Sequence, residues 1–224
     1  MPRTPQPVDP DPPQVCGEVA FPLPTCHRLP EEFKSCNDQC ALTQEDVLQL
    51  EEATIKQYDC DQWVAARRDR INASTAYKII NRQKDINEKL MSTLFRPKAF
   101  TSEATSHGLR NEQNAKAAYV IRKPGSHIHD CGLVVNPNFS FIGATPDSKV
   151  CDEGLSGILE IKCPFTARNY TVAEAALTLS DFPIVQRGDE LLSINPYHDH
   201  YIQVQLQLMV TGAPFCDYVV YTHR

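Results

Sequence analysis

The segment GILEIKCPF, Gly157 to Phe165, decides the fold that this sequence predicts. Its apolar residues indicate a buried strand, yet a carboxylate and an ammonium group, Glu160 and Lys162, lie two residues apart within it. Because successive side chains of a strand point to opposite faces, Glu160 and Lys162 share one face while Leu159 and Ile161 share the other. The pattern predicts a strand with one packing face and one charged face.

A second carboxylate precedes this strand. Asp147 follows a proline in FIGATPDSKV, whose short apolar runs and turn residues predict a neighbouring strand. Carboxylates that lie close together repel each other unless a cation lies between them, and oxygen ligands of this kind suit Mg²⁺ or Mn²⁺. Lys162 would then orient a water that attacks phosphorus and offset developing negative charge. Taken alone, the strand fits an ordinary half-exposed strand with a Glu/Lys pair on one face. A metal site is favoured by the combined motif, in which twelve residues separate Pro-Asp from Glu-X-Lys.

The length of the chain, 224 residues, suits one good-sized domain or two small ones. No apolar run approaches the roughly 18 residues of a membrane span, and the N-terminus lacks the apolar core of a secretory signal. We therefore expect an intracellular protein of the nucleus or cytoplasm that is not secreted and has no membrane partner. Nine scattered cysteines do not form a disulfide framework, so we expect mostly reduced thiols.

The net charge of -6 argues at first against a polyanionic partner. The charge is uneven, however: residues 1–62 hold four basic and twelve acidic residues, which leaves a net charge of +2 on residues 63–224. Within that part, RRDRINASTAYKIINRQK, Arg67 to Lys84, has six basic residues and one acidic residue. The overall charge conceals a local cationic segment.

Residues 1–42 form a Pro- and Cys-rich N-terminal lead that we expect to be extended or flexible, since nine of the 17 prolines fall within the first 30 residues. Cys26, His27, Cys36 and Cys40 are soft ligands that could hold zinc, but their spacing lacks a clean pair, so ordinary unliganded cysteines are favoured and zinc is the alternative.

Residues 43–224 predict a single mixed α/β domain with a covered sheet. Helical periodicity or capping residues predict five helices. One begins at Ser74, and the others lie in LTQEDVLQLEEATIKQY, with Thr43 as N-cap, in DINEKLMSTLF, in TSHGLRNEQNAKAAYVIRK and in HDHYIQVQLQLMVTG. CGLVVNP, SFIGATPDSKV, GILEIKCP and CDYVVYTHR predict strands, and the segment before the last helix predicts loops.

Five segments in this order resemble the lambda exonuclease and YqaJ-type viral recombinase family of the PD-(D/E)XK nuclease superfamily. They are RRDRINAS, HGLRNEQNAKAAY, the TPD of residues 145–147, LEIKCPFTARNY and YIQVQLQLMVTG, and they span roughly residues 62–224. The resemblance implies a restriction-endonuclease-like core, in which helices flank a mixed central sheet. In this family the chain usually continues past the strand that CDYVVYTHR represents, so we expect the domain to be C-terminally truncated.

The resemblance also implies the roles of individual residues. Asp147 and Glu160 would bind the catalytic Mg²⁺ or Mn²⁺, with the main-chain carbonyl of Ile161 as a further ligand. Lys162 would position the attacking water, and Glu112 would reach the metal directly or through water. Gln203 would complete the active site from the last helix, although a one-residue slip to Gln205 or Gln207 stays open.

Three further residues match positions that the family uses to hold a terminal 5′-phosphate: Arg67, Ser74 and Thr145. Arginine donates to phosphate oxygens in a fork, and Ser74 at a helix start would add backbone N–H groups and the helix dipole. A solvated basic face and a plain N-cap serine are the alternatives.

These residues and the resemblance together imply a metal-dependent deoxyribonuclease, a 5′→3′ exonuclease acting on duplex DNA with a free, phosphorylated 5′ end. The residues themselves do not distinguish a role in DNA recombination from one in repair or in defence against foreign DNA. The family's ring-like assemblies imply a homo-oligomer. Two alternatives remain: a non-catalytic nucleic-acid-binding relic of a viral or transposon recombinase, and a structure-specific endonuclease of the same superfamily. His198 and His200 are interpreted as polar surface before the last helix.

Overall fold

The computed structural model describes residues 41–96, 101–187 and 191–224. Almost all of the predicted N-terminal lead falls outside these residues, and so do Cys26, His27, Cys36 and Cys40, the residues considered as an alternative zinc site. None of the helices in the described segments is both long enough and apolar enough to cross a membrane.

Seven α-helices lie within the described part of the chain. They are α2 (Gln44–Ala53), α3 (Asp61–Arg68), α4 (Tyr77–Ile80), α5 (Glu88–Phe95), α6 (Glu103–Arg122), α7 (Val172–Thr178) and α8 (Asp199–Thr211). At the start of α2, Thr43 and Asp46 form the reciprocal hydrogen bonds of a capping box, as their spacing predicts. At the end of α8, Gly212 takes the left-handed conformation that closes a helix. The helices predicted near α2, α5, α6 and α8 are confirmed.

The helix predicted from Ser74 is wrong in its extent. A 3-10 turn, Ala73–Thr75, precedes the four-residue helix α4, and Ile80, expected on the buried face, is 61% exposed. A helix of four residues provides almost no aligned backbone dipole, so this part of the expected phosphate site is lost.

The central sheet has the strand order β2-β5-β6-β9. Its strands are β2 (Ser126–His129), β5 (Ser148–Asp152), β6 (Leu155–Lys162) and β9 (Cys216–Val220). β2, β5 and β6 pair in antiparallel fashion, whereas β9 pairs with β6 in parallel, which requires a crossover connection. The α7–α8 segment provides it, and the expected mixed central sheet flanked by helices is confirmed.

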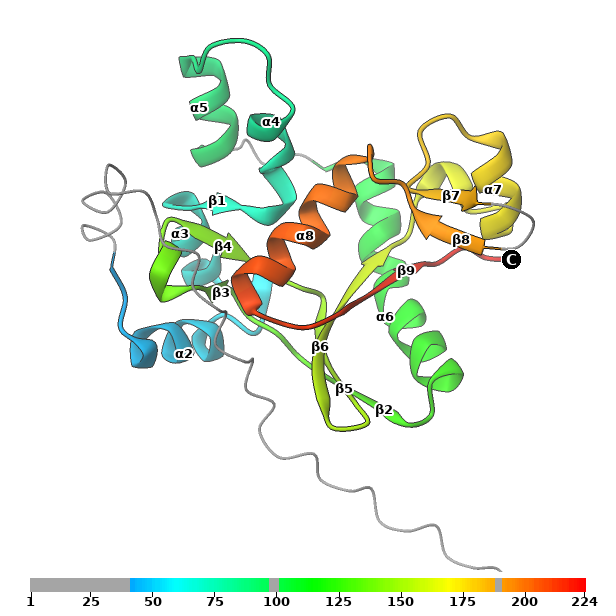
Figure 1. Ribbon diagram of the computed structural model, residues 1–224, viewed down its shortest axis with the longest axis horizontal. Coiled ribbons are helices and arrows are strands. Elements are labelled where there is room, and N and C mark those ends of the chain that lie inside the picture. Colours follow the sequence, from blue (N-terminus) through cyan, green and yellow to red (C-terminus); the bar gives the residue numbers. More distant parts are fainter. Residues whose placement is uncertain (1–40, 97–100, 188–190) are drawn as a thin grey trace, which may run out of the picture.

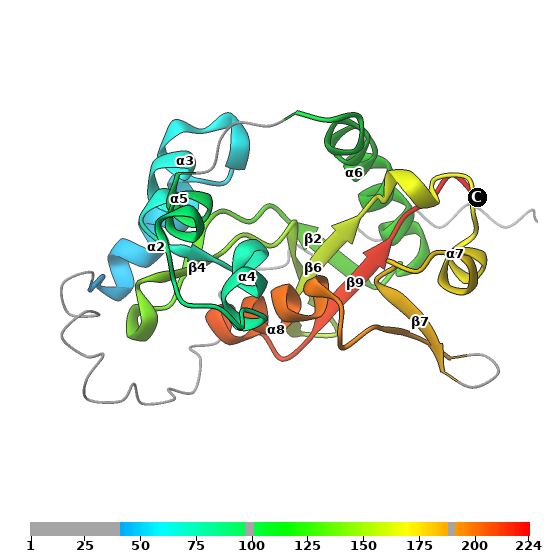
Figure 2. The same cartoon turned by 90° about the horizontal axis from the view of Figure 1, so that it is seen from above.

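Two smaller sheets are not predicted by the sequence. One has the order β1-β4-β3, with β1 (Ile71–Asn72), β4 (Ile142–Ala144) and β3 (Val134–Val135). The other is an antiparallel pair of β7 (Ile184–Arg187) and β8 (Leu191–Ile194), in a segment that we expected to be a loop. In Figure 2, helices α2–α5 lie at one end of the molecule, and β7 and α7 lie at the other.

The two faces of β6 differ as its alternation predicts. Leu159 and Ile161 pack with Ala115 and Tyr119 of α6 in one apolar cluster. On the opposite side, Glu160 points toward α8, which crosses between the two larger sheets (Figure 1). The strand therefore supports a hydrophobic core on one face and directs its charged residues toward a separate site on the other.

Candidate active site

Asp147 is held directly beside β6. Its backbone N–H donates to the carbonyl of Leu159 at 3.1 Å, and its Oδ2 accepts a 2.6 Å hydrogen bond from the N–H of Ile161. These two bonds bracket Glu160, the residue between Leu159 and Ile161. The Pro-Asp turn and the Glu-X-Lys strand thus place both carboxylates at the same point of the sheet.

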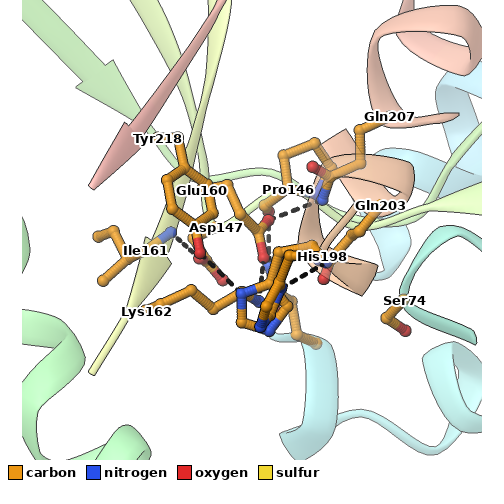
Figure 3. Close-up of polar contacts among 12 residues, drawn as sticks. Ser74, Pro146, Asp147, Glu160, Ile161, Lys162, His198, Gln203, Gln207 and Tyr218 are labelled. Atoms are coloured by element: carbon orange, nitrogen blue, oxygen red, sulfur yellow. Dashed lines mark hydrogen bonds and ion pairs between the residues drawn. The ribbon is translucent and has the colours of Figure 1, made fainter. Parts of the chain in front are cut away.

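The carboxylate of Glu160 is 2% exposed and fully engaged. Its Oε1 accepts from Lys162 Nζ at 2.5 Å and from Gln203 Nε2 at 2.6 Å, while its Oε2 accepts from Gln207 Nε2 at 2.7 Å (Figure 3). A buried charge is tolerated when it has a partner charge and hydrogen bonds. The structure brings Glu160, Lys162 and Gln203 together as the sequence predicts.

The electrostatics of this cluster favour an added cation. Burial and the neighbouring Glu160 carboxylate raise the pKa of Asp147 to about 8. Burial alone would lower the pKa of Lys162, but attraction by Glu160 and Asp147 outweighs it and raises the pKa. Once Asp147 ionises, two carboxylates face one ammonium group, and a divalent cation would neutralise the excess negative charge and favour that ionised form.

Glu112 approaches the same site from α6. It pairs with Lys116 at 3.0 Å, and Lys116 also donates to the main-chain carbonyl of Asp147 at 2.8 Å. Within the described segments, no group of three or more His, Cys, Asp or Glu side chains is gathered tightly enough to hold a metal. Asp147 and Glu160 carry hard oxygen donors of the kind that Mg²⁺ and Mn²⁺ prefer, so these residues fit such an ion. Their roles as ligands, like that of Glu112, stay predictions.

Gln207 is a site residue that sequence analysis did not separate from its neighbours. It lies one helical turn after Gln203 on α8, so both amides reach the same carboxylate. Gln205 is exposed, which favours Gln203 over Gln205, whereas Gln207, the other position left open, also contacts Glu160. The signal in the sequence is the spacing of four residues between Gln203 and Gln207, which predicts two amides on one helix face.

The predicted phosphate residues also meet. Arg67 donates from Nη1 to Thr145 Oγ1 at 3.3 Å and from Nη2 to Ser74 Oγ at 3.4 Å. Its guanidinium lies 4.2 Å from the ring centre of Trp63, whose indole N–H donates to Thr145. Burial lowers the pKa of Arg67 to about 10, and no carboxylate pairs with it among the residues described. This is a desolvated cation fixed by neutral groups, and one of them, Thr145, lies two residues before Asp147 in the chain.

The interpretation of His200 as polar surface is wrong. Its Nδ1 lies 2.7 Å from the phenol oxygen of Tyr218, and it lines a pocket together with Lys162 and Glu112. His198 stacks edge to face on His200, with ring centres 4.4 Å apart. Nothing in the local sequence indicates this, because Tyr218 belongs to a strand 18 residues later.

Residues 62–214 match the YqaJ-like viral recombinase domain. The chain belongs to this family. A relative is the alkaline nuclease of Orgyia pseudotsugata multicapsid polyhedrosis virus, 33% identical over 104 residues that cover 41% of this chain and 24% of the relative. This YqaJ-like chain thus spans only about a quarter of that viral protein.

Solved structures agree with the family. The alkaline exonuclease LHK-Exo from Laribacter hongkongensis is 27% identical, with a TM-score of 0.54 over 72% of this chain and 74% of that one, and it has also been solved with dAMP. The SOX–DNA complex is 15% identical, with a TM-score of 0.56 over 82% of this YqaJ-like chain and 59% of SOX, and it shows the fold alone. The restriction-endonuclease-like fold is confirmed.

Proposed function

We propose that this YqaJ-like domain is a metal-dependent deoxyribonuclease that hydrolyses phosphodiester bonds as a 5′→3′ exonuclease. The observation that supports this most strongly is the joint position of Asp147, Glu160 and Lys162 on one side of β6. Relatives that are named as an alkaline nuclease and an alkaline exonuclease support the same class of reaction.

The metal site consists of the side chains of Asp147 and Glu160 and the main-chain carbonyl of Ile161, with Glu112 acting directly or through water. A bound Mg²⁺ or Mn²⁺ would supply Lewis-acid polarisation of the phosphate and an acidified water. Gln203 and Gln207 hold the Glu160 carboxylate in one orientation by hydrogen bonds to separate oxygens. Fixed orientation of a ligand lowers the entropy that binding and reaction would otherwise cost.

Lys162 positions the attacking water and stabilises negative charge as it develops on the phosphate. Its ammonium is already directed at Glu160 at 2.5 Å, and its pKa is raised, so it stays charged throughout the neutral range. A preorganised cation in a site that excludes water is worth more than one in solvent.

Arg67, Ser74 and Thr145 hold the terminal 5′-phosphate. The Arg67 guanidinium lacks an anionic partner among the described residues, while stacking on Trp63 fixes its plane. A guanidinium held in this way forms short charge-assisted bonds with phosphate oxygens. Thr145 and Asp147, two residues apart, join this phosphate site to the metal site, and this linkage supports action at an end of the DNA.

The partner is duplex DNA with a free 5′ end, and a homo-oligomer that encircles it belongs to the same proposal. Among the similar structures, SOX is solved in complex with DNA and LHK-Exo with dAMP. These ligands are those of the neighbours and support a nucleic-acid substrate for this domain.

The test is release of nucleotides from linear duplex DNA by the purified protein with and without Mg²⁺. We expect metal-dependent release by the wild-type protein and none by Lys162→Ala or Asp147→Ala. Equal activity in all three proteins would refute the proposal. Cleavage of closed circular DNA would favour the endonuclease alternative, and DNA binding without cleavage by the wild-type protein would favour the non-catalytic relic.

A further inference from the structure

A pocket of about 310 Å³ opens at the C-terminal end of β6. Lys162 and Pro164 form one side, Gly108 and Glu112 of α6 form another, and His200 of α8 closes it. The pocket therefore joins the ammonium group of the proposed nuclease site to a histidine that has no assigned role. Glu112 does not leave an uncompensated negative charge there, because Lys116 pairs with it at 3.0 Å.

The tautomer of His200 follows from its contact with Tyr218. The single described hydrogen-bond partner of the Tyr218 phenol oxygen is His200 Nδ1, at 2.7 Å. Burial and the nearby Glu160 raise the pKa of Tyr218, so the phenol keeps its proton. A protonated phenol with one partner donates to it, which makes Nδ1 the acceptor and leaves the ring hydrogen on Nε2.

The imidazole of His200 also stays uncharged. Burial and the neighbouring Lys162 lower the pKa of His200 to about 3. No hydrogen bond joins its Nε2 to any residue in the described segments. His200 is thus a neutral N–H donor. It is held by the hydrogen bond with Tyr218 and by edge-to-face packing with His198, and it lines the pocket that contains Lys162.

We propose that His200 is a further catalytic residue, whose Nε2–H donates a hydrogen bond to a nonbridging oxygen of the scissile phosphate beside Lys162. This inference rests on the proposed nuclease function. It adds His200 to the two groups already proposed to act on the scissile phosphate, the metal ion and Lys162. A neutral donor adds stabilisation of the developing charge without repelling a cation bound by Asp147 and Glu160. Tyr218 acts as a positioning residue, because it touches the phosphate only through His200.

The experiment compares wild-type protein, His200→Ala, His200→Gln and Tyr218→Phe on duplex DNA with Mg²⁺. We expect His200→Ala to lower kcat by about 100-fold with little change in KM, as for the loss of one oxyanion donor. His200→Gln, which keeps an N–H donor, should recover part of the loss, and Tyr218→Phe should fall between. His127→Ala is the matched control, since His127 is exposed on β2, two strands away from β6, and should retain full activity.

A second readout separates contact with the phosphate from a structural effect. Each of the two nonbridging oxygens is replaced by sulfur in a stereodefined phosphorothioate at the scissile position. If His200 donates to one of these oxygens, His200→Ala should lower kcat less on the diastereomer with sulfur at that position than on the all-oxygen substrate. The reason is that sulfur has already weakened the hydrogen bond from His200 in the wild-type protein. Equal costs on all three substrates would overturn the proposal even if His200→Ala is unstable.

The two proposals fail in different ways. A wild-type chain that does not cleave DNA would overturn the nuclease function and the role of His200 with it. A wild-type chain that cleaves, while His200→Ala retains kcat within about threefold, would overturn only the role of His200.

Discussion

Gln207 on α8 donates a 2.7 Å hydrogen bond to Glu160 on β6, and both side chains are almost fully buried. The two residues are 47 positions apart in the chain. Gln203 donates to the other oxygen of the same carboxylate, so one helix fixes the orientation of the proposed metal ligand. α8 is therefore part of the site and more than the crossover between β6 and β9.

Substitution of Gln207 by alanine should reduce both stability and activity. It leaves Glu160 Oε2 buried without its donor, which costs about 1–3 kcal/mol of unfolding free energy. Urea denaturation measures the stability, and the duplex-DNA assay measures the activity. Gln205→Ala, an exposed position on the same helix, is the control and should change neither. Equal behaviour of the two variants would contradict a role for Gln207 in holding Glu160.

The local sequence predicts those parts of the fold that depend on local physics. The capping box at Thr43, the periodicity of α6 and the left-handed Gly212 predict helices that the structure confirms. The sequence does not predict α7, although Thr171 and Glu174 form a second capping box, because the helix is only seven residues long. The division into three sheets depends on pairings between distant segments, such as β1 with β4, which alternation alone does not specify.

The candidate site shows the same division. Alternation in β6 predicts that Glu160 and Lys162 share a face, and the Pro-Asp turn predicts the position of Asp147. The partners that fix these groups could not be predicted, because their roles depend on tertiary contacts. Trp63 under Arg67 and Tyr218 against His200 are examples, in each of which a long-range contact orients a residue at the site.

Without metal, the stability of the protein should fall as the pH rises toward 8. Folding raises the pKa of Asp147 from its ordinary 3.8 to about 8. Between these two pH values the folded state retains a proton that the unfolded state has released. Stability is therefore greatest at the acid end and declines with pH, at most by about 1.4 kcal/mol per pH unit for one group. Thermal melts with EDTA from pH 5 to 8 should show a steeper loss in the wild-type protein than in Asp147→Asn. A steeper loss in Asp147→Asn would contradict the sign.

Mn²⁺ should raise the melting temperature of the wild-type protein. An ion that binds only the folded state at 100 times its Kd adds about 2.7 kcal/mol, which corresponds to several degrees for a chain of this size. Asp147→Ala removes one of the two carboxylates and should abolish the rise. An equal rise in wild-type protein and Asp147→Ala would place the binding of Mn²⁺ elsewhere in the chain.

Removal of Arg67 should abolish the preference for phosphorylated 5′ ends. Arg67→Ala takes away the guanidinium that contacts Ser74 and Thr145, and Arg67→Lys keeps the charge but loses the planar fork. We expect both variants to cleave 5′-phosphate and 5′-hydroxyl duplexes at more similar rates than the wild-type protein does. The control is Arg68→Ala, because Arg68 is exposed and adjacent on α3. If Arg68→Ala loses the preference and Arg67→Ala keeps it, the phosphate site lies on the outer face of the helix.

Gly132 should tolerate no side chain, because α2 packs directly on the backbone there. A Cβ at this position would overlap the carbonyl oxygen of Glu51 at the end of α2. The neighbouring Leu133 N–H donates to Thr54 Oγ1 at 2.8 Å, so the backbone cannot move away without breaking a buried hydrogen bond. Gly132→Ala should therefore lower the unfolding free energy by at least about 1–3 kcal/mol, the usual cost of overpacking. Gly125→Ala, where a Cβ meets nothing within 4 Å, is the control in the same thermal melt. Equal melting temperatures for the two variants would show that α2 is free to shift away from β3, and that the end of the molecule with Arg67 is less rigid than its packing indicates.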